Sequence, residues 1–262
     1  MFFPEAQSHP DFEKLHLSHI INKIKRDFIW LREHIPSKPD KTMPTVSIFD
    51  PIADAYDRWY DTPEGSTIFQ EEIQCLRCLC DDYSGLWLEV GIGTGRFATA
   101  LGITHGIDLS LCMVAKAARR GVRAQVGSAG HLPFRRESFD GVLMALTLCF
   151  LENPEAAFLE CGRVLPEKGR LILGTIPADS SWGRAYIKKG TEGHPTYSHA
   201  RFHTIMETIR LAEKYNFELR QSCSALFWGP DSRQAGPSKA ETGIISEAGF
   251  VGLLFEAHRA DS

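Results

Sequence analysis

The residues with the clearest chemical potential lie in a glycine-rich turn, Glu89-Val-Gly91-Ile-Gly93-Thr-Gly95, which follows a short apolar run. Because glycine has no Cβ, three glycines at a spacing of two allow the backbone to turn sharply and to approach a ligand closely. Backbone N–H groups at the start of the following helix would point into the same space. This turn therefore predicts a ligand that is contacted closely by the main chain.

The residues around the turn argue against phosphate ligands. A dinucleotide fingerprint, G-x-G-x-x-G, requires glycine where Arg96 stands, and the string G-x-x-x-x-G-K-[ST] does not occur. Two carboxylates are present instead, with Glu89 before the turn and Asp108 at the end of the next predicted strand. A carboxylate at the second position can accept both hydroxyls of a ribose, and Glu89 suits the ammonium group of an amino-acid tail. The pattern predicts an adenosine joined to a zwitterionic amino acid.

A second stretch with chemical potential runs from 180 to 202 and is rich in aromatic, His and Arg residues. We expect an insertion at about 178–203 that forms a lid over a planar or anionic acceptor. His194 and His199 are candidate general bases, because imidazole titrates near neutral pH. A surface excursion with solvated histidines is an equally weighted alternative.

Alternating strand and helix patterns must position these residues. Seven apolar runs predict strands at 86–90, 103–107, 122–126, 139–146, 170–176, 217–227 and 250–258. Helical patterns separate them, which implies right-handed crossovers between parallel strands. We therefore expect a doubly wound, Rossmann-like α/β fold, with a mainly parallel seven-stranded sheet and helices on both faces. Ligands of such sheets bind at the carboxyl ends of the strands.

Further motifs follow the glycine-rich turn in a fixed order. The strings are Leu88-Glu-Val-Gly-Ile-Gly-Thr-Gly-Arg-Phe-Ala98, Gly106-Ile-Asp108-Leu-Ser110, His131-Leu-Pro-Phe134, Ser138-Phe-Asp140 and Arg163-Val-Leu-Pro-Glu-Lys-Gly-Arg-Leu171. Together they resemble the type 11 family of class I S-adenosylmethionine-dependent methyltransferases, which are similar to the enzymes that methylate ubiquinone and menaquinone precursors. The segment from Phe49 to Trp59 resembles the family's entry segment, whose aromatic residues close over the cofactor. The resemblance covers residues 48–176, about half of the chain.

This resemblance implies an enzyme that transfers a methyl group directly from S-adenosylmethionine to a small-molecule acceptor. Carried over by position, it assigns these residues to the cofactor: Tyr56, Glu89, Gly91, Gly93, Gly95, Asp108, Leu109, Met113, Ser128, Ala129 and Leu146. Asp108 would hold the ribose diol, and Leu146 would border the methionine chain. Tyr56 is also a candidate catalytic residue beside His194 and His199, although the family has no universal catalytic residue.

Two departures from the family pattern affect the cofactor. Ser128 stands where the family usually has an acidic residue, so the adenine amino group loses a carboxylate acceptor. The segment between Gly95 and Asp108 is shorter than usual. We therefore expect weaker or differently posed cofactor binding. The alternative function is a protein that binds S-adenosylmethionine without turnover, in a regulatory or partner role. A nicotinamide oxidoreductase is a further alternative that Arg96 disfavours.

The composition is that of an ordinary globular protein. The 262 residues are 43% hydrophobic and 24% charged, with a net charge of -4. No basic field is present to attract nucleic acid, no apolar run has the roughly 20 residues of a membrane span, and the start does not resemble a signal peptide. We expect a cytoplasmic protein. The cluster Cys75, Cys78 and Cys80 lacks a second ligand pair, so we expect these residues to be packed rather than to bind metal.

Residues 1–45 form a separate predicted unit of helix and linker ahead of the methyltransferase domain at 46–262. An amphipathic helix is expected at 11–35, with its apolar stripe formed by Leu17, Ile21, Ile24, Phe28, Leu31 and Ile35. The stripe predicts packing on the chain's own domain, a cap over the active site or a homodimer contact.

Overall fold

The computed structural model describes residues 47–80, 83–232 and 237–258. The helix expected at 11–35, the linker after it and the homodimer contact all lie outside these residues and stay predictions.

The described residues form one sheet with the strand order β3-β2-β1-β4-β5-β8-β6-β7. The strands are β1 (Trp87–Val90), β2 (His105–Asp108), β3 (Arg123–Val126), β4 (Gly141–Ala145), β5 (Arg170–Thr175), β6 (Phe217–Ala225), β7 (Glu241–Thr242) and β8 (Phe250–Ala257). β1 to β5 pair in parallel, and β8 lies antiparallel between β5 and β6. The predicted doubly wound, mainly parallel fold is confirmed, and the two-residue β7 extends the seven predicted strands at one edge.

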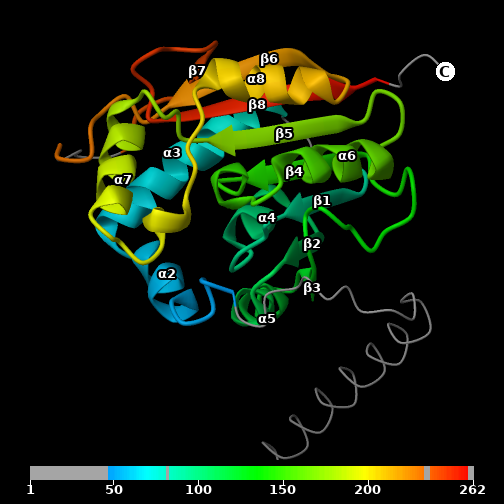
Figure 1. The fold of residues 1–262 in the computed structure, drawn as a ribbon, viewed down its shortest axis with the longest axis horizontal. Helices are drawn as coiled ribbons and strands as arrows, with labels where there is room; N and C mark the ends of the chain where they lie inside the picture. The colour runs from blue at the N-terminus through cyan, green and yellow to red at the C-terminus, as the bar shows by residue number, and fades with distance from the viewer. Residues whose placement is uncertain (1–46, 81–82, 233–236, 259–262) are drawn as a thin grey trace, which may run out of the picture. The chain divides into compact units, whose positions relative to one another are not determined.

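The helices lie between and around these strands (Figure 1). They are α2 (Ala53–Trp59), α3 (Pro63–Leu79), α4 (Arg96–Leu101), α5 (Leu111–Arg119), α6 (Pro154–Val164), α7 (Ser181–Thr191) and α8 (Ile205–Lys214), with 3₁₀ helices η1 (Leu148–Phe150) and η2 (Tyr197–His199). Local sequence determines where several of these helices begin. The side chains of Ser110 and Asn153 cap the N-termini of α5 and α6, and Pro154 occupies the first turn of α6. Among the described helices, none is long and apolar enough to span a membrane.

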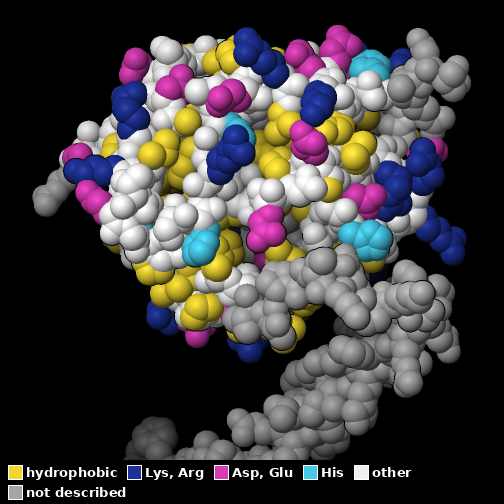
Figure 2. Space-filling view, viewed as in Figure 1, with side chains coloured by type: hydrophobic (Ala, Val, Ile, Leu, Met, Phe, Trp, Pro, Cys, Tyr) yellow, Lys and Arg dark blue, Asp and Glu magenta, His cyan; other side chains and the backbone are white. Residues whose placement is uncertain are grey.

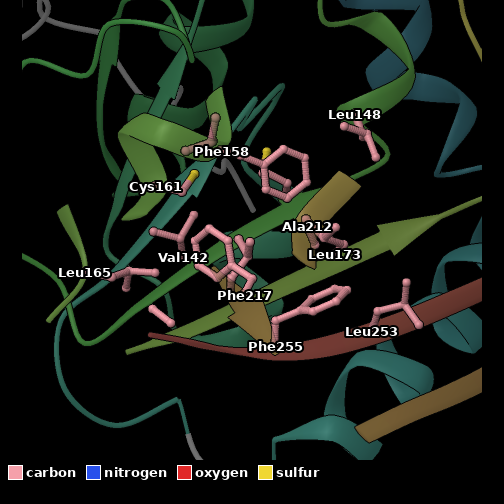
Figure 3. Packing of buried hydrophobic residues seen from close by; sticks show 14 of the residues in the cluster. Val142, Leu148, Phe158, Cys161, Leu165, Leu173, Ala212, Phe217, Leu253 and Phe255 are labelled. Atoms are coloured by element: carbon pink, nitrogen blue, oxygen red, sulfur yellow. The ribbon is translucent and has the colours of Figure 1, made fainter. Parts of the chain in front are cut away.

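Alternate side chains of β4 enter hydrophobic clusters on opposite faces of the sheet. Val142 and Met144 pack with side chains of α6 and α8 (Figure 3), whereas Leu143 and Ala145 pack with side chains of α3, α4 and α5. Because both faces are covered, all five residues of β4 are buried and the strand reads as a continuous apolar run.

The predicted cysteine cluster lies at the end of α3. Cys75 and Cys80 are buried, and the Cys75 thiol donates to the carbonyl oxygen of Cys223 at 3.1 Å. The Arg170 guanidinium donates to the Cys80 sulfur at 3.2 Å. The described residues contain no group of three or more His, Cys, Asp or Glu side chains arranged to hold a metal ion.

The carboxyl ends of the parallel strands share one edge of the sheet, and α2 and α7 lie beyond that edge (Figure 1). On the face drawn in Figure 2, acidic and basic side chains are interspersed, and hydrophobic side chains gather toward α2. Ligands of such sheets bind at the carboxyl ends of the strands, so we expect the site on the side of the sheet where α2 and α7 lie.

Candidate functional site

The glycine-rich turn joins β1 to α4, and each glycine has a different reason to be there. Gly91, Gly93 and Gly95 all have left-handed φ angles, of 74°, 53° and 80°. A Cβ on Gly91 would lie 2.2 Å from Oγ1 of Thr147, and one on Gly95 would lie 2.9 Å from Cα of Ala117. A Cβ on Gly93 would meet nothing within 4 Å. Gly91 and Gly95 are therefore required for packing, while Gly93 borders open space that a ligand could enter.

Asp108 at the end of β2 holds this turn in place. Its Oδ2 accepts from the N–H of Gly93 at 2.8 Å, and its Oδ1 accepts from the N–H of Ser110 at 2.8 Å. Burial raises the pKa of Asp108, and these two hydrogen bonds oppose the rise. Since each carboxylate oxygen has a second lone pair, Asp108 can support the turn and accept ribose hydroxyls at the same time.

Glu89 lies on β1 beneath the turn and is 1% exposed. Its Oε2 has no hydrogen-bond partner among the described residues. Burial raises the pKa of Glu89 well above its usual range, although a hydrogen bond from the Ala98 N–H opposes the shift. A buried polar group without a partner is costly, so a ligand ammonium group would relieve this carboxyl group. The carboxyl groups of Asp108 and Glu89 thus fit the two ends of an adenosyl amino acid, the ribose and the ammonium group.

Of the residues expected at the adenine, Leu109, Ser128 and Ala129 lie at the same end of the sheet, whereas Met113 is buried in the interior. Leu109 is 43% exposed beside Asp108, which is unusual for a large apolar side chain and suits a contact with a planar base. The N–H of Gly127 donates to the Asp108 carbonyl at 2.9 Å, which places Ser128 and the half-buried Ala129 at the same end of the sheet. Met113 is 2% exposed, so its side chain lies in the interior, where the sequence gives no reason to prefer a ligand contact over packing.

Ser128 offers a direct test of the adenine position. This residue has a hydroxyl group where the family has a carboxylate, and its Oγ accepts from the N–H of Gly130 at 3.2 Å. We expect Ser128→Asp to tighten S-adenosylhomocysteine binding by roughly threefold to tenfold, because a hydrogen bond to a charged group contributes about 1.5–3 kcal/mol before the new charge is desolvated. Calorimetry would measure this change, with Ser128→Asn as the uncharged control. Equal or weaker binding by the aspartate variant would contradict the assignment of Ser128 to the adenine.

The segment from Phe49 to Trp59 closes over the strand ends. The Phe49 ring packs edge-on against Phe150 and Tyr56, with centroid distances of 5.0 Å and 6.4 Å. Asp50 accepts from the Ser110 hydroxyl at 2.5 Å, so the segment reaches from the start of α5 to η1. Leu146, directly after β4, has a left-handed φ of 56°, a strained conformation for a leucine that often marks functional loops.

An ion cluster fastens α2, and with it Tyr56, to the glycine-rich turn. Asp57 accepts from Arg96 at 2.8 Å and from Arg120 at 2.9 Å. Arg96 also bonds the exposed Asp61 at 2.8 Å. Burial raises the pKa of Asp57, but hydrogen bonds from Arg96 and Arg120 outweigh it and lower the pKa to about 2. The position at which a dinucleotide fingerprint requires glycine is thus used to anchor the cover of the site.

We expect Asp57→Ala to loosen this cover. Loss of the carboxylate leaves two partly buried arginines without their main partner, which costs on the order of 1–3 kcal/mol in this partly screened setting. The Tm should fall by several degrees, and the Kd for S-adenosylhomocysteine should rise about tenfold because α2 carries Tyr56. Asp61→Ala is the matched control, since the Asp61 side chain is 65% exposed and exposed pairs contribute little.

The pKa of Asp57 adds a pH dependence to the same comparison. Since its folded pKa lies below the ordinary value of 3.8, its stabilising effect is present above pH 3.8 and is lost as the pH falls toward about 2. The Tm difference between Asp57→Ala and the wild type should therefore be full at pH 5 and should shrink below pH 3.8. A difference of equal size at pH 2.5 would contradict the ion cluster.

The predicted insertion at 178–203 contains α7 and η2. The Arg201 N–H donates to the Cys149 carbonyl at 2.6 Å, which ties the end of the insertion to η1. His194 and His199 are both exposed, and the Nδ1 of His194 accepts from the N–H groups of Thr196 and Tyr197. Both histidines are therefore open to solvent in this structure, and their assignment as candidate general bases stays a prediction.

Sequence reasoning missed Glu72 on α3. This side chain is 2% exposed and its Oε2 has no partner among the described residues. Burial raises its pKa to about 8, and the neighbouring Glu71 contributes to the rise. A signal was present, because Glu72 lies four residues from both Ile68 and Leu76 and so shares their buried stripe.

Comparisons with known proteins agree with a site for an adenosyl amino acid, because they match this chain to methyltransferases. A family model described as a methyltransferase domain matches residues 88–173. An uncharacterised protein of Mycobacterium tuberculosis is 37% identical over 82% of this chain and 75% of its own length, and one of Methanocaldococcus jannaschii is 33% identical over 80% and 99%. The crystal structure of a Thermotoga maritima protein, described as an S-adenosylmethionine-dependent methyltransferase and possible histamine N-methyltransferase, is 34% identical, covers 80% of this chain and 98% of its own, and superimposes with a TM-score of 0.74.

Proposed function

Because the chain belongs to the type 11 family of class I S-adenosylmethionine-dependent methyltransferases, we propose that it methylates a small-molecule acceptor by direct transfer. The observation that carries the proposal is that the chain's own α2 and α7 lie beyond the carboxyl ends of the strands (Figure 1). Tyr56, Tyr186 and Tyr197 are only half-buried, which suits contact with a small partner better than docking of a macromolecule. The description of the Thermotoga maritima protein names a small molecule as well.

The residues on either side of the glycine-rich turn would position the reactants. S-adenosylmethionine, when bound, supplies an electrophilic methyl group on a sulfonium. Asp108 would hold its ribose and Glu89 its ammonium group, while Phe49 and Tyr56 would exclude water from above. Alignment of two reactants in this way can lower a barrier by about 7–11 kcal/mol in favourable cases. A general base is needed only if the attacking atom carries a proton.

A binding protein without turnover is the second candidate. Ser128 favours it, because this residue provides no carboxylate for the adenine amino group. Such a protein would bind the cofactor and methylate no acceptor.

Two measurements test the proposal. Thermal shift with S-adenosylmethionine, S-adenosylhomocysteine and NAD should show stabilisation by the first two alone. Formation of S-adenosylhomocysteine should then appear with at least one member of a panel of small amines, phenols, thiols and carboxylates. Binding without turnover across the panel would favour the second candidate, and stabilisation by none of the three ligands would overturn both.

A further inference from the structure

Four tyrosines lie on or directly after α2 and on α7 and η2, and we refer to Tyr56, Tyr60, Tyr186 and Tyr197 as the tyrosine cluster. The hydroxyls of Tyr56 and Tyr60 lie 3.0 Å apart, and the rings of Tyr186 and Tyr197 are 4.5 Å apart. The charge of Glu72 raises the pKa of every tyrosine in the cluster, after the larger effect of burial. Tyr60 also packs against Phe69 of α3, with a centroid distance of 5.4 Å. Phe69 lies three residues before Glu72 and so on a neighbouring part of the helix surface, which places the Tyr56–Tyr60 pair beside the stretch of α3 that carries Glu72.

The tyrosine cluster adjoins the cofactor residues. Burial raises the pKa of Tyr56, and the charges of Glu72 and Asp108 add to the rise, so Tyr56 is within electrostatic range of both carboxyl groups. Tyr60 also contacts the ring of Phe97 on α4, with a centroid distance of 6.5 Å. A group held at Glu72 would thus be near a methyl donor held at Asp108 and the glycine-rich turn.

Within the part of the chain that the structure describes, the Oε2 of Glu72 has no hydrogen-bond partner. Glu71, its neighbour on α3, is occupied by donors from Leu226, Trp228 and Ser238. Lys189 and Arg96 lie over the rings of Tyr186 and Tyr60, and among the described residues no cation forms an ion pair with Glu72. Buried carboxylates are normally paired, and aromatic faces attract cations. A buried carboxyl group that no described cation pairs with, near aromatic rings, is suited to receive a cationic ligand.

We propose that Glu72 and the tyrosine cluster bind the methyl acceptor as a protonated primary or secondary amine, and that Glu72 then removes its proton. This inference rests on the proposed function and specifies its acceptor as nitrogen. Anionic acceptors are disfavoured, since they would face the Glu72 carboxylate without a compensating positive charge.

The reaction balances with the groups present. The ammonium gives one proton to the Glu72 carboxylate, which leaves a neutral amine with a free electron pair. The nitrogen forms a bond to the methyl carbon while the carbon–sulfur bond breaks and its electron pair stays on sulfur. The product is the methylated ammonium ion with S-adenosylhomocysteine, and Glu72 releases its proton to solvent. A raised pKa suits Glu72 to this role, because a base works best when its pKa is close to that of its partner and to the working pH.

Calorimetry on the protein saturated with S-adenosylhomocysteine tests the site without turnover. The probes are benzylamine, 2-phenylethylamine and butylamine, each paired with its neutral alcohol counterpart. We expect at least one amine to bind tenfold or more tightly than its alcohol. Glu72→Gln should abolish that preference and should leave the affinity for S-adenosylhomocysteine within about twofold. Glu155→Gln, an exposed glutamate of α6, is the matched control and should behave as wild type.

The pH dependence of methylation separates a proton acceptor from a merely structural carboxyl group. In wild type, kcat/KM for the amine should rise through a limb near pH 8, because ionised Glu72, flanked by Glu71 and the tyrosine cluster, is needed. Glu72→Gln should lose this limb and respond only to the deprotonation of the amine itself. Failure to bind S-adenosylhomocysteine would overturn the proposed function. Two outcomes would overturn this inference alone, with S-adenosylhomocysteine still bound. One is that no amine binds more tightly than its alcohol, and the other is that Glu72→Gln leaves the amine preference unchanged.

Discussion

Replacing Asp108 with alanine should weaken the binding of S-adenosylmethionine and S-adenosylhomocysteine by tenfold or more. The carboxylate accepts from the N–H groups of Gly93 and Ser110, so the change removes the support of the glycine-rich turn together with the acceptor for ribose. Hydrogen bonds to a charged group contribute about 1.5–3 kcal/mol each, and a tenfold change corresponds to about 1.4 kcal/mol. The effect should therefore be easily measured by calorimetry.

Two further variants separate the contributions of Asp108. Asp108→Asn retains one oxygen acceptor and should lose less affinity than alanine. Asp140→Asn is the control, because Asp140 accepts from the Leu86 N–H at 2.7 Å, ahead of β4 and away from the strand ends. If Asp108→Ala bound S-adenosylhomocysteine within twofold of wild type, the assignment of the ribose to Asp108 would be wrong.

Glu72→Gln should make the protein more stable above neutral pH. Burial raises the pKa of Glu72 from an ordinary value of 4.5 to about 8, so between these values the folded protein binds more protons than the unfolded chain. Stability is then undiminished below pH 4.5, falls as the pH rises, and levels off above about 8. One unit of pKa shift corresponds to about 1.4 kcal/mol, which puts the cost of the ionised carboxyl group at several kcal/mol.

The measurement is the Tm difference between Glu72→Gln and wild type as a function of pH. It should be small at pH 4.5 and should grow to about 10–20 °C at pH 8 to 9, since 1 kcal/mol shifts the Tm of a domain this size by about 2–4 °C. The same difference for Glu155→Gln should stay flat over this range. A difference for Glu72→Gln that does not grow with pH would show that its carboxyl group is paired after all. Stability given up in this way is typical of residues kept for function.

Local patterns in the sequence were sufficient to predict the sheet, and they also predict which residues would hold the cofactor. The continuous apolar run of β4 and the alternation of strands with helices indicate a parallel sheet, because both of its faces must be covered. Three glycines followed by Asp108 place a close-contact turn and a carboxylate at neighbouring strand ends, since the carboxyl ends of parallel strands meet at one edge. This reasoning is local and depends only on residue type and spacing.

The acceptor side depends on contacts between segments far apart in the chain, and only the tertiary structure reveals it. His194 and His199 are candidate bases by residue type, and only the structure shows that both side chains are exposed. Glu72 reads as one of many helix carboxylates until the folded structure shows that its side chain is only 2% exposed. Arg96 reads only as a departure from a dinucleotide fingerprint until Asp57 is found beside it. Burial changes the pKa of a group and the need for a partner, and burial is a property of the folded protein.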